Sequence, residues 1–156
     1  RAQADNKIID LTTDDLFWVA QTWKRAAFLF HRERTFAQAF QAFDYAPTIN
    51  SPSLGMLTLW SALEHLFAPA KQELRFRVSA LIACYLTEPG VERMEFHKKL
   101  QKLYDERSLA AHTTDAVDIE SASETFLIMS MILQKIITDD RVPTREFLEK
   151  LLFGAA

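Results

Sequence analysis

The chain has 156 residues and a formal net charge of −3, with 49% hydrophobic and 25% charged residues. These values are ordinary for a globular protein, and the length suffices for one domain that buries most of its unfolded surface. The slightly acidic balance disfavours nucleic-acid binding through overall charge, so any such binding needs a local patch. The single cysteine, Cys84, excludes a disulfide within the chain and favours a reducing compartment.

Membrane insertion and secretion are not predicted. The longest apolar run, 126–133, is shorter than the about 20 residues that span a bilayer, and Ser130 interrupts it. No signal peptide opens the chain. The first residue is Arg1 rather than methionine, which favours a fragment or processed form of a longer protein. We therefore expect a cytoplasmic chain without a membrane partner.

Apolar residues recur every three or four positions almost throughout, which predicts an all-α bundle of about six helices in one domain over 1–156. Residues 1–12 are expected to form a polar lead-in, and the most apolar helix, around 126–136, is expected to be the central packing element. The first expected helix is capped by Thr13 or Asp14 and runs through Ala27, and a second stretch, from Phe36 to Phe43, follows a bend near 31–34. The next helices are expected from Ser53 to before Pro69 and from Lys71 to Leu86, and another, which carries Arg107, follows Pro89-Gly90. The last two are a helix capped by Asp115 that ends at Asp139 and a short one from Thr144 to Phe153.

Two charged residues break the apolar pattern of their helices. Arg107 follows Leu100 and Leu103 at helical spacing and therefore lies on the core-facing stripe. A guanidinium keeps its charge inside a protein, so it needs a carboxylate or a phosphate opposite it. Glu64 lies one helical turn after Trp60, on or beside another packing face. We therefore predict that Glu64 and Arg107 meet.

Common catalytic motifs are absent from the sequence. There is no glycine-rich phosphate loop, no His-Glu-x-x-His, no Cys-x-x-Cys and no nucleophile elbow. His112, Asp115 and Asp118 are spaced three apart, but such residues after a polar loop more often cap a helix than bind a metal. We expect no metal and no cofactor.

His112 is the second candidate for chemistry, beside Arg107. Five residues of a regular helix advance by about 500°, so the two side chains would point roughly 140° apart. Two arrangements would bring them together: the helix ends before His112, or the pair is completed across a dimer interface. The polar stretch 113–115 is typical of a loop and a cap, which favours the first arrangement.

The stretches around these residues resemble a known family. The run Leu103-Tyr104-Asp105-Glu106-Arg107-Ser108, followed by His112, resembles the Arg-x4-6-His motif of the HEPN superfamily. Together with 59–67, it is more narrowly similar to the Apea-like HEPN branch, over roughly residues 30–140. Many HEPN nucleases carry Asn, Asp or His directly after the arginine, where this chain has Ser108.

This resemblance implies a helical bundle that dimerises, with Arg107 and His112 of both protomers facing one cleft. Many members are metal-independent endoribonucleases in anti-phage defence, toxin–antitoxin or RNA-processing systems. Apea-like members often form the C-terminal part of a longer protein. The implied partners are RNA, including tRNA, a second copy of the chain, and an additional N-terminal sensing domain or regulator.

The residue types suit this reaction. RNA is cleaved without a metal when its own 2′-hydroxyl attacks the adjacent phosphate, and His112 is suited to the proton transfer because histidine titrates near neutrality. Arg107 offers a bidentate cation where charge develops on the phosphate. In supporting roles, Ser108 would position the phosphate, Glu64 would hold Arg107, and Tyr104 would line the cleft. Weak steering of RNA would fall to Lys98, Lys99 and Lys102, whose charge is diluted by neighbouring acids.

Two alternatives to an active nuclease remain open. In the first, Glu64 and Arg107 form a structural ion pair that fixes the register of two helices. In the second, the chain is a catalytically silent HEPN module for dimerisation or for sensing RNA or nucleotides. An active nuclease requires Arg107 and His112 to face one open cleft, whereas a structural pair predicts Arg107 sealed from solvent.

Overall fold

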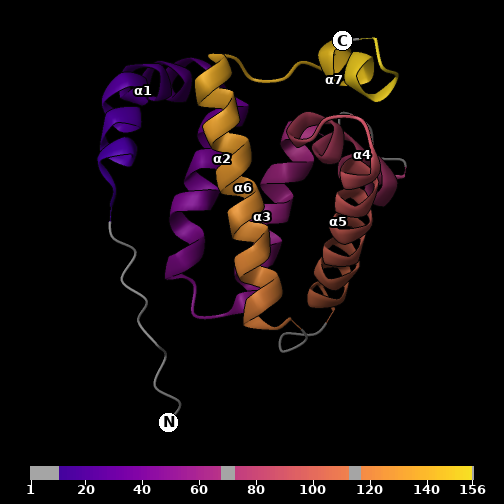
Figure 1. Ribbon diagram of the computed structural model, residues 1–156. Coiled ribbons are helices and arrows are strands. Elements are labelled where there is room, and N and C mark those ends of the chain that lie inside the picture. The colour runs from indigo at the N-terminus through magenta and orange to yellow at the C-terminus, as the bar shows by residue number, and fades with distance from the viewer. Residues whose placement is uncertain (1–10, 68–72, 113–116, 156) are drawn as a thin grey trace.

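The computed structural model describes residues 11–67, 73–112 and 117–155 (Figure 1). These ranges contain helices and no strand, which confirms the all-α prediction. The helices, in chain order, are α1 (Thr13–Arg32), α2 (Arg34–Tyr45), the 3-10 turn η1 (Ala46–Thr48), α3 (Pro52–Phe67), α4 (Leu74–Leu86), α5 (Val91–Ala110), α6 (Ile119–Asp139) and α7 (Arg145–Leu152). No helix of the described part is long and apolar enough to cross a membrane.

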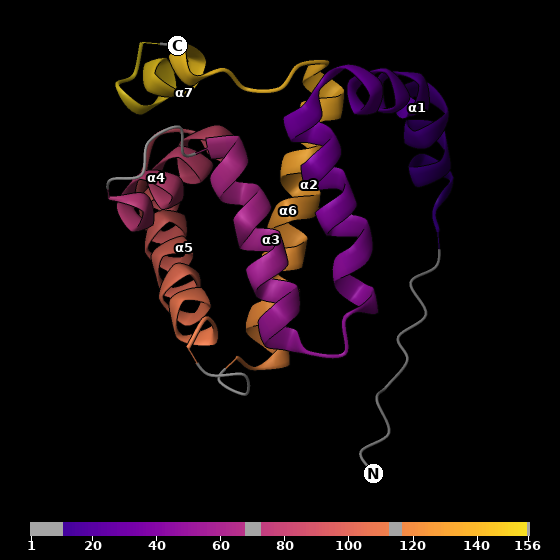
Figure 2. The same cartoon turned by 180° about the vertical axis from the view of Figure 1, so that it is seen from behind.

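Helix α3 is the centre of the bundle. It packs against α2, α4, α5 and α6, and both views show it between the α1–α2 pair and the α4–α5 pair (Figures 1 and 2). Trp60 and Leu63 of α3 are fully buried. The prediction that the helix around 126–136 is central was wrong, because this helix, α6, leaves Leu127 and Met131 half exposed on its outer face.

The predicted bend near 31–34 is a single residue, Glu33, whose extended backbone separates α1 from α2. Helix α1 begins one residue earlier than expected. Thr12, rather than Thr13 or Asp14, is the N-cap, and its side chain forms a capping box with Asp15. The predicted lead-in at 1–12 lies mostly outside the described residues.

Helices α4 and α5 form an antiparallel pair that positions the end of α5. Gly90, with a φ of 152°, provides the turn into α5. Near the other end, the Arg75 guanidinium of α4 donates two hydrogen bonds to the Asp105 carboxylate of α5. This bidentate pair ties the last turns of α5 to the first turn of α4.

The start of α6 differs from the sequence prediction. Asp118 is its N-cap and accepts a hydrogen bond of 2.7 Å from the Ser121 backbone N–H. Asp115, the predicted cap, lies outside the described residues. The predicted start of α7 is confirmed, because Thr144 caps it through the Phe147 N–H.

Candidate active site

The predicted meeting of Glu64 and Arg107 is confirmed. Arg107 Nη2, near the end of α5, lies 3.0 Å from Glu64 Oε1 of α3. The two side chains keep 24% and 19% of their surface exposed. The pair is therefore partly buried, and Arg107 is not sealed from solvent. Its Nε atom is buried and has no hydrogen-bond partner within the described residues.

Tyr104 completes the cluster from one helical turn earlier on α5. Its hydroxyl donates a hydrogen bond of 3.0 Å to Glu64 Oε1, and the Arg107 guanidinium lies 5.5 Å from its ring centre. Burial and, secondarily, this hydrogen bond raise the pKa of Tyr104, so the hydroxyl remains a donor at neutral pH. We call Glu64, Tyr104 and Arg107 the carboxylate cluster.

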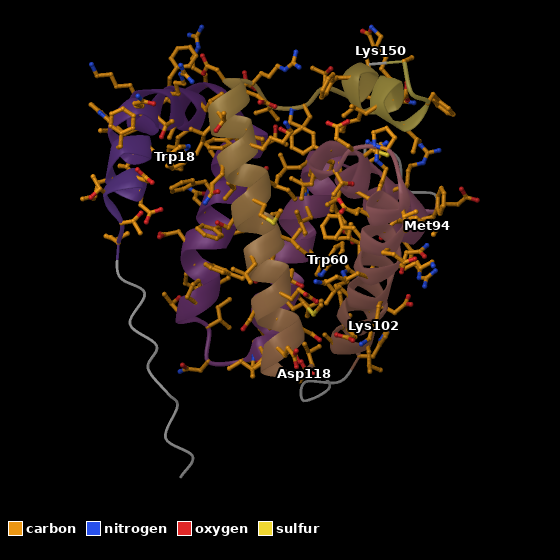
Figure 3. All side chains as sticks on the ribbon, in the orientation of Figure 1. Trp18, Trp60, Met94, Lys102, Asp118 and Lys150 are labelled. Carbon is orange, nitrogen blue, oxygen red and sulfur yellow. The ribbon has the colours of Figure 1, made fainter. Side chains whose placement is uncertain are left out.

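The buried side of the carboxylate cluster rests on Trp60 of α3. The rings of Trp60 and Tyr104 pack edge to face with centres 5.2 Å apart, and Figure 3 shows Trp60 in the interior, beside α5. Sequence analysis placed Trp60 on a packing face and Tyr104 at the cleft but gave no sign that they contact each other. Their contact fixes the Tyr104 ring, and the ring in turn limits where Arg107 can lie.

His112 lies in the turn that follows α5, and its side chain is exposed. The helix ends at Ala110, and the His112 backbone N–H bonds to the Leu109 carbonyl at 3.0 Å. This confirms that the helix ends before His112. Within the described residues, however, no hydrogen bond or ion pair joins His112 to Arg107, and four pockets in this part of the chain are lined by other residues.

The three predicted steering lysines all lie on α5, and each has a carboxylate nearby. Lys98 pairs with Glu95 at 2.8 Å, Lys99 pairs with Glu124 of α6, and Lys102 lies 3.9 Å from Glu106. Lys102 projects from the outer side of α5 (Figure 3). Their local charge is largely balanced, which leaves little net attraction for RNA.

Ser108 is the remaining predicted supporting residue. It follows Arg107 directly on α5 and is partly exposed. The described residues contain no group of three or more His, Cys, Asp or Glu side chains that could hold a metal ion.

Comparison with known proteins gives no relative for this chain. No protein-family model, no curated protein and no solved structure matches it. The likeness to HEPN proteins therefore depends on the residues already described: the Arg107–His112 spacing at the end of α5 and the 59–67 stretch of α3.

Proposed function

We propose that this chain is a metal-independent endoribonuclease domain of the HEPN type. It would cleave RNA, including tRNA, in the cytoplasm, as a homodimer and as the C-terminal part of a bacterial anti-phage or toxin–antitoxin-like protein. The observation that carries this proposal is the partly exposed Arg107 guanidinium, held by Glu64 and Tyr104, with an exposed His112 just beyond the end of the same helix.

The proposed reaction is an internal transesterification. The RNA 2′-oxygen bonds to the adjacent phosphorus while the bond from phosphorus to the 5′-oxygen breaks. His112 takes the proton of the 2′-hydroxyl, the departing 5′-oxygen takes a proton from water, and Arg107 stabilises the negative charge that develops on the phosphate. Glu64 and Tyr104 act as positioning residues by holding the guanidinium. The products are a 2′,3′-cyclic phosphate and a 5′-hydroxyl.

A catalytically silent module is the second candidate. It is favoured by the direct contact between Glu64 and Arg107, because the Glu64 carboxylate already binds one of the guanidinium nitrogens that would otherwise bind a phosphate. In this case the ion pair fixes the register of α3 and α5, and the chain serves dimerisation or the sensing of RNA or nucleotides.

An RNA cleavage assay in EDTA tests the active-site proposal. The substrate is a pool of tRNA and single-stranded RNA, and the variants are Arg107→Ala and His112→Ala. We expect both variants to remain folded by circular dichroism and to lose at least about a hundredfold in rate, the usual size of an acid–base or charge-stabilising contribution. The parent should leave cyclic-phosphate ends.

Matched controls separate catalysis from general surface effects. Arg145→Ala removes a more exposed arginine that also pairs with a glutamate, and His31→Ala removes an exposed histidine distant in sequence. Both should cleave like the parent. If the parent binds RNA without cleaving it, and His112→Ala binds equally well, the silent module is the correct assignment. If Arg107→Ala unfolds the chain, the ion pair is structural.

A further inference from the structure

A cavity of about 600 Å³ lies between the α2–α3 connection and the first turns of α6. Its lining comes from two stretches that are far apart in the sequence, 46–59 and 119–127. Figures 1 and 2 show the end of α2, the start of α3 and the start of α6 at the same end of the bundle. Volumes of roughly 300–1,000 Å³ are usual for sites that hold a small organic molecule. Among the described residues, none that lines this cavity belongs to the candidate active site.

Small residues keep this cavity open. Gly55 of α3 is buried and lines it, and a Cβ added there would lie 3.6 Å from the Ala46 carbonyl oxygen, an ordinary van der Waals distance. The site therefore has room for an alanine, which forms helices better than glycine does. Ala122 and Ser123 are the small residues on the α6 side of the cavity. Helix packing does not require a glycine here, so the space left by its missing side chain is available to a ligand.

The walls of the cavity are apolar and held in place by the core. Leu59 of α3 is 2% exposed. Phe126 of α6 forms another wall, and Phe43 of α2 stacks on it with ring centres 4.3 Å apart. Ile119 and Leu127 also line the cavity and remain 75% and 61% exposed, so a bound molecule would cover apolar surface that now faces water. Such a preformed cavity binds an apolar molecule without first having to order its own side chains.

The cavity offers no counter-charge to an anion. The lining residues that the structure describes include no charged side chain. The stretches around them, 35–70 and 108–134, contain no lysine or arginine. Lys99, on the neighbouring helix α5, is already paired with Glu124, which does not line the cavity. An anionic group would therefore lose its hydration without gaining a cation, which disfavours a carboxylate, a phosphate or RNA.

One edge of the cavity can form hydrogen bonds with a ligand. Asn50 is exposed at this edge, and its carboxamide has no hydrogen-bond partner within the described residues. Ser51 beside it accepts a hydrogen bond of 3.3 Å from the Leu54 backbone N–H. A carboxamide both donates and accepts hydrogen bonds. Asn50 can therefore bind one N–H, O–H or carbonyl group of a molecule whose apolar part lies deeper.

We propose that this cavity binds a neutral, mainly apolar small molecule. Its apolar body lies against Leu59 and Phe126, and its one hydrogen-bonding group lies at Asn50. The proposal is independent of the proposed nuclease activity, because neither Arg107 nor His112 lines the cavity. A chain that cleaves no RNA would therefore bind the molecule as well as an active one.

The neutral dye N-phenylnaphthylamine tests the cavity in the full chain. It has two aromatic units and a single N–H, and its fluorescence rises in apolar surroundings. We expect the parent to bind one dye molecule. Ser123→Phe places a ring at the cavity and removes only a hydroxyl that bonds to the Ile119 carbonyl of its own helix, so the variant should fold and bind at least about tenfold more weakly. Gln134→Phe adds the same ring to an exposed position on α6, two turns beyond Leu127, and should bind like the parent.

Two further comparisons test the class of ligand. Anilinonaphthalene sulfonate differs from the first dye by one anionic group and should bind the parent at least about tenfold more weakly. Asn50→Ala should weaken binding of the neutral dye about fivefold, because it removes one hydrogen bond. Sulfonate binding as tight as that of the neutral dye would overturn the proposed class. No binding of the neutral dye by the parent, or binding that Ser123→Phe leaves unchanged, would overturn the site itself, and the second result would place the dye on other exposed apolar residues, such as those of α1.

Discussion

Glu64 Oε1 accepts from two different side chains, Arg107 and Tyr104, each at 3.0 Å. Sharing one oxygen couples the two donors. The Tyr104 hydroxyl orients the carboxylate, and the carboxylate fixes the guanidinium. Because Arg107 Nε lacks a hydrogen-bond partner within the described residues, the orientation of this guanidinium depends heavily on Glu64.

This coupling predicts non-additive changes in stability. Tyr104→Phe removes one hydrogen bond and should lower the free energy of unfolding by about 1 kcal/mol. Glu64→Gln removes the negative charge opposite a partly buried guanidinium and should lower it by about 1–2 kcal/mol. In the double variant the loss should be smaller than the sum, because both changes affect contacts at the same oxygen. Urea unfolding measures all three, and strictly additive losses would show that the residues act independently.

A second tyrosine, Tyr85, is expected to make the folded chain sensitive to alkali. Its hydroxyl is buried and has no hydrogen-bond partner among the described residues, and burial strongly raises its pKa. Near pH 10 the unfolded chain begins to release this proton while the folded chain retains it. The free energy of unfolding should therefore fall as the pH rises above about 10, by up to 1.4 kcal/mol per pH unit for this one group.

Tyr85→Phe separates this group from the others. It removes a hydroxyl without a partner, so the stability at pH 7 should be unchanged or higher by up to about 1 kcal/mol. The decline between pH 10 and pH 11 should become shallower, although Tyr104, whose pKa is also raised, continues to contribute. Guanidinium unfolding across this range makes the comparison. An equally steep decline in the variant would assign the alkaline sensitivity to other groups.

Sequence reasoning located the ion pair but not its surroundings. Arg107 and Glu64 could be matched because each places a charge on an otherwise apolar stripe. Helical spacing also predicts that Lys102 pairs with Glu106, four residues further on. The sequence does not predict the contact of Lys99 with Glu124, because it joins α5 to α6 and depends on how the two helices pack.

At the scale of the element, the helices were predicted more accurately than their ends. The polar stretch before α6 offers two aspartates as caps, and propensity does not distinguish them. The structure selects Asp118 because Val117 before it is buried and Ala122, four residues after it, is partly buried against the core. These residues hold the chain at the helix entry as a hydrophobic staple does. The burial of these two residues favours Asp118 as the cap.

At the scale of the whole molecule, hydrophobicity misidentified the central helix. Helix α6 carries more large apolar residues, but α3 is the helix that packs against α2, α4, α5 and α6. Composition counts apolar residues and does not say which helix the others surround. The arrangement of helices therefore required the structure, whereas the fold class did not.

The connection between α1 and α2 has a consequence for motion. Only Thr22 and Leu29 of α1 are buried, and the single extended residue Glu33 joins the two helices. Little buried surface opposes local unfolding of α1, so its amide hydrogens should exchange with solvent well before those of α3. Hydrogen exchange measured by mass spectrometry tests this, and equal protection of α1 and α3 would contradict it. Opening at Glu33 would then release α1 alone and leave the helices that pack on α3 folded.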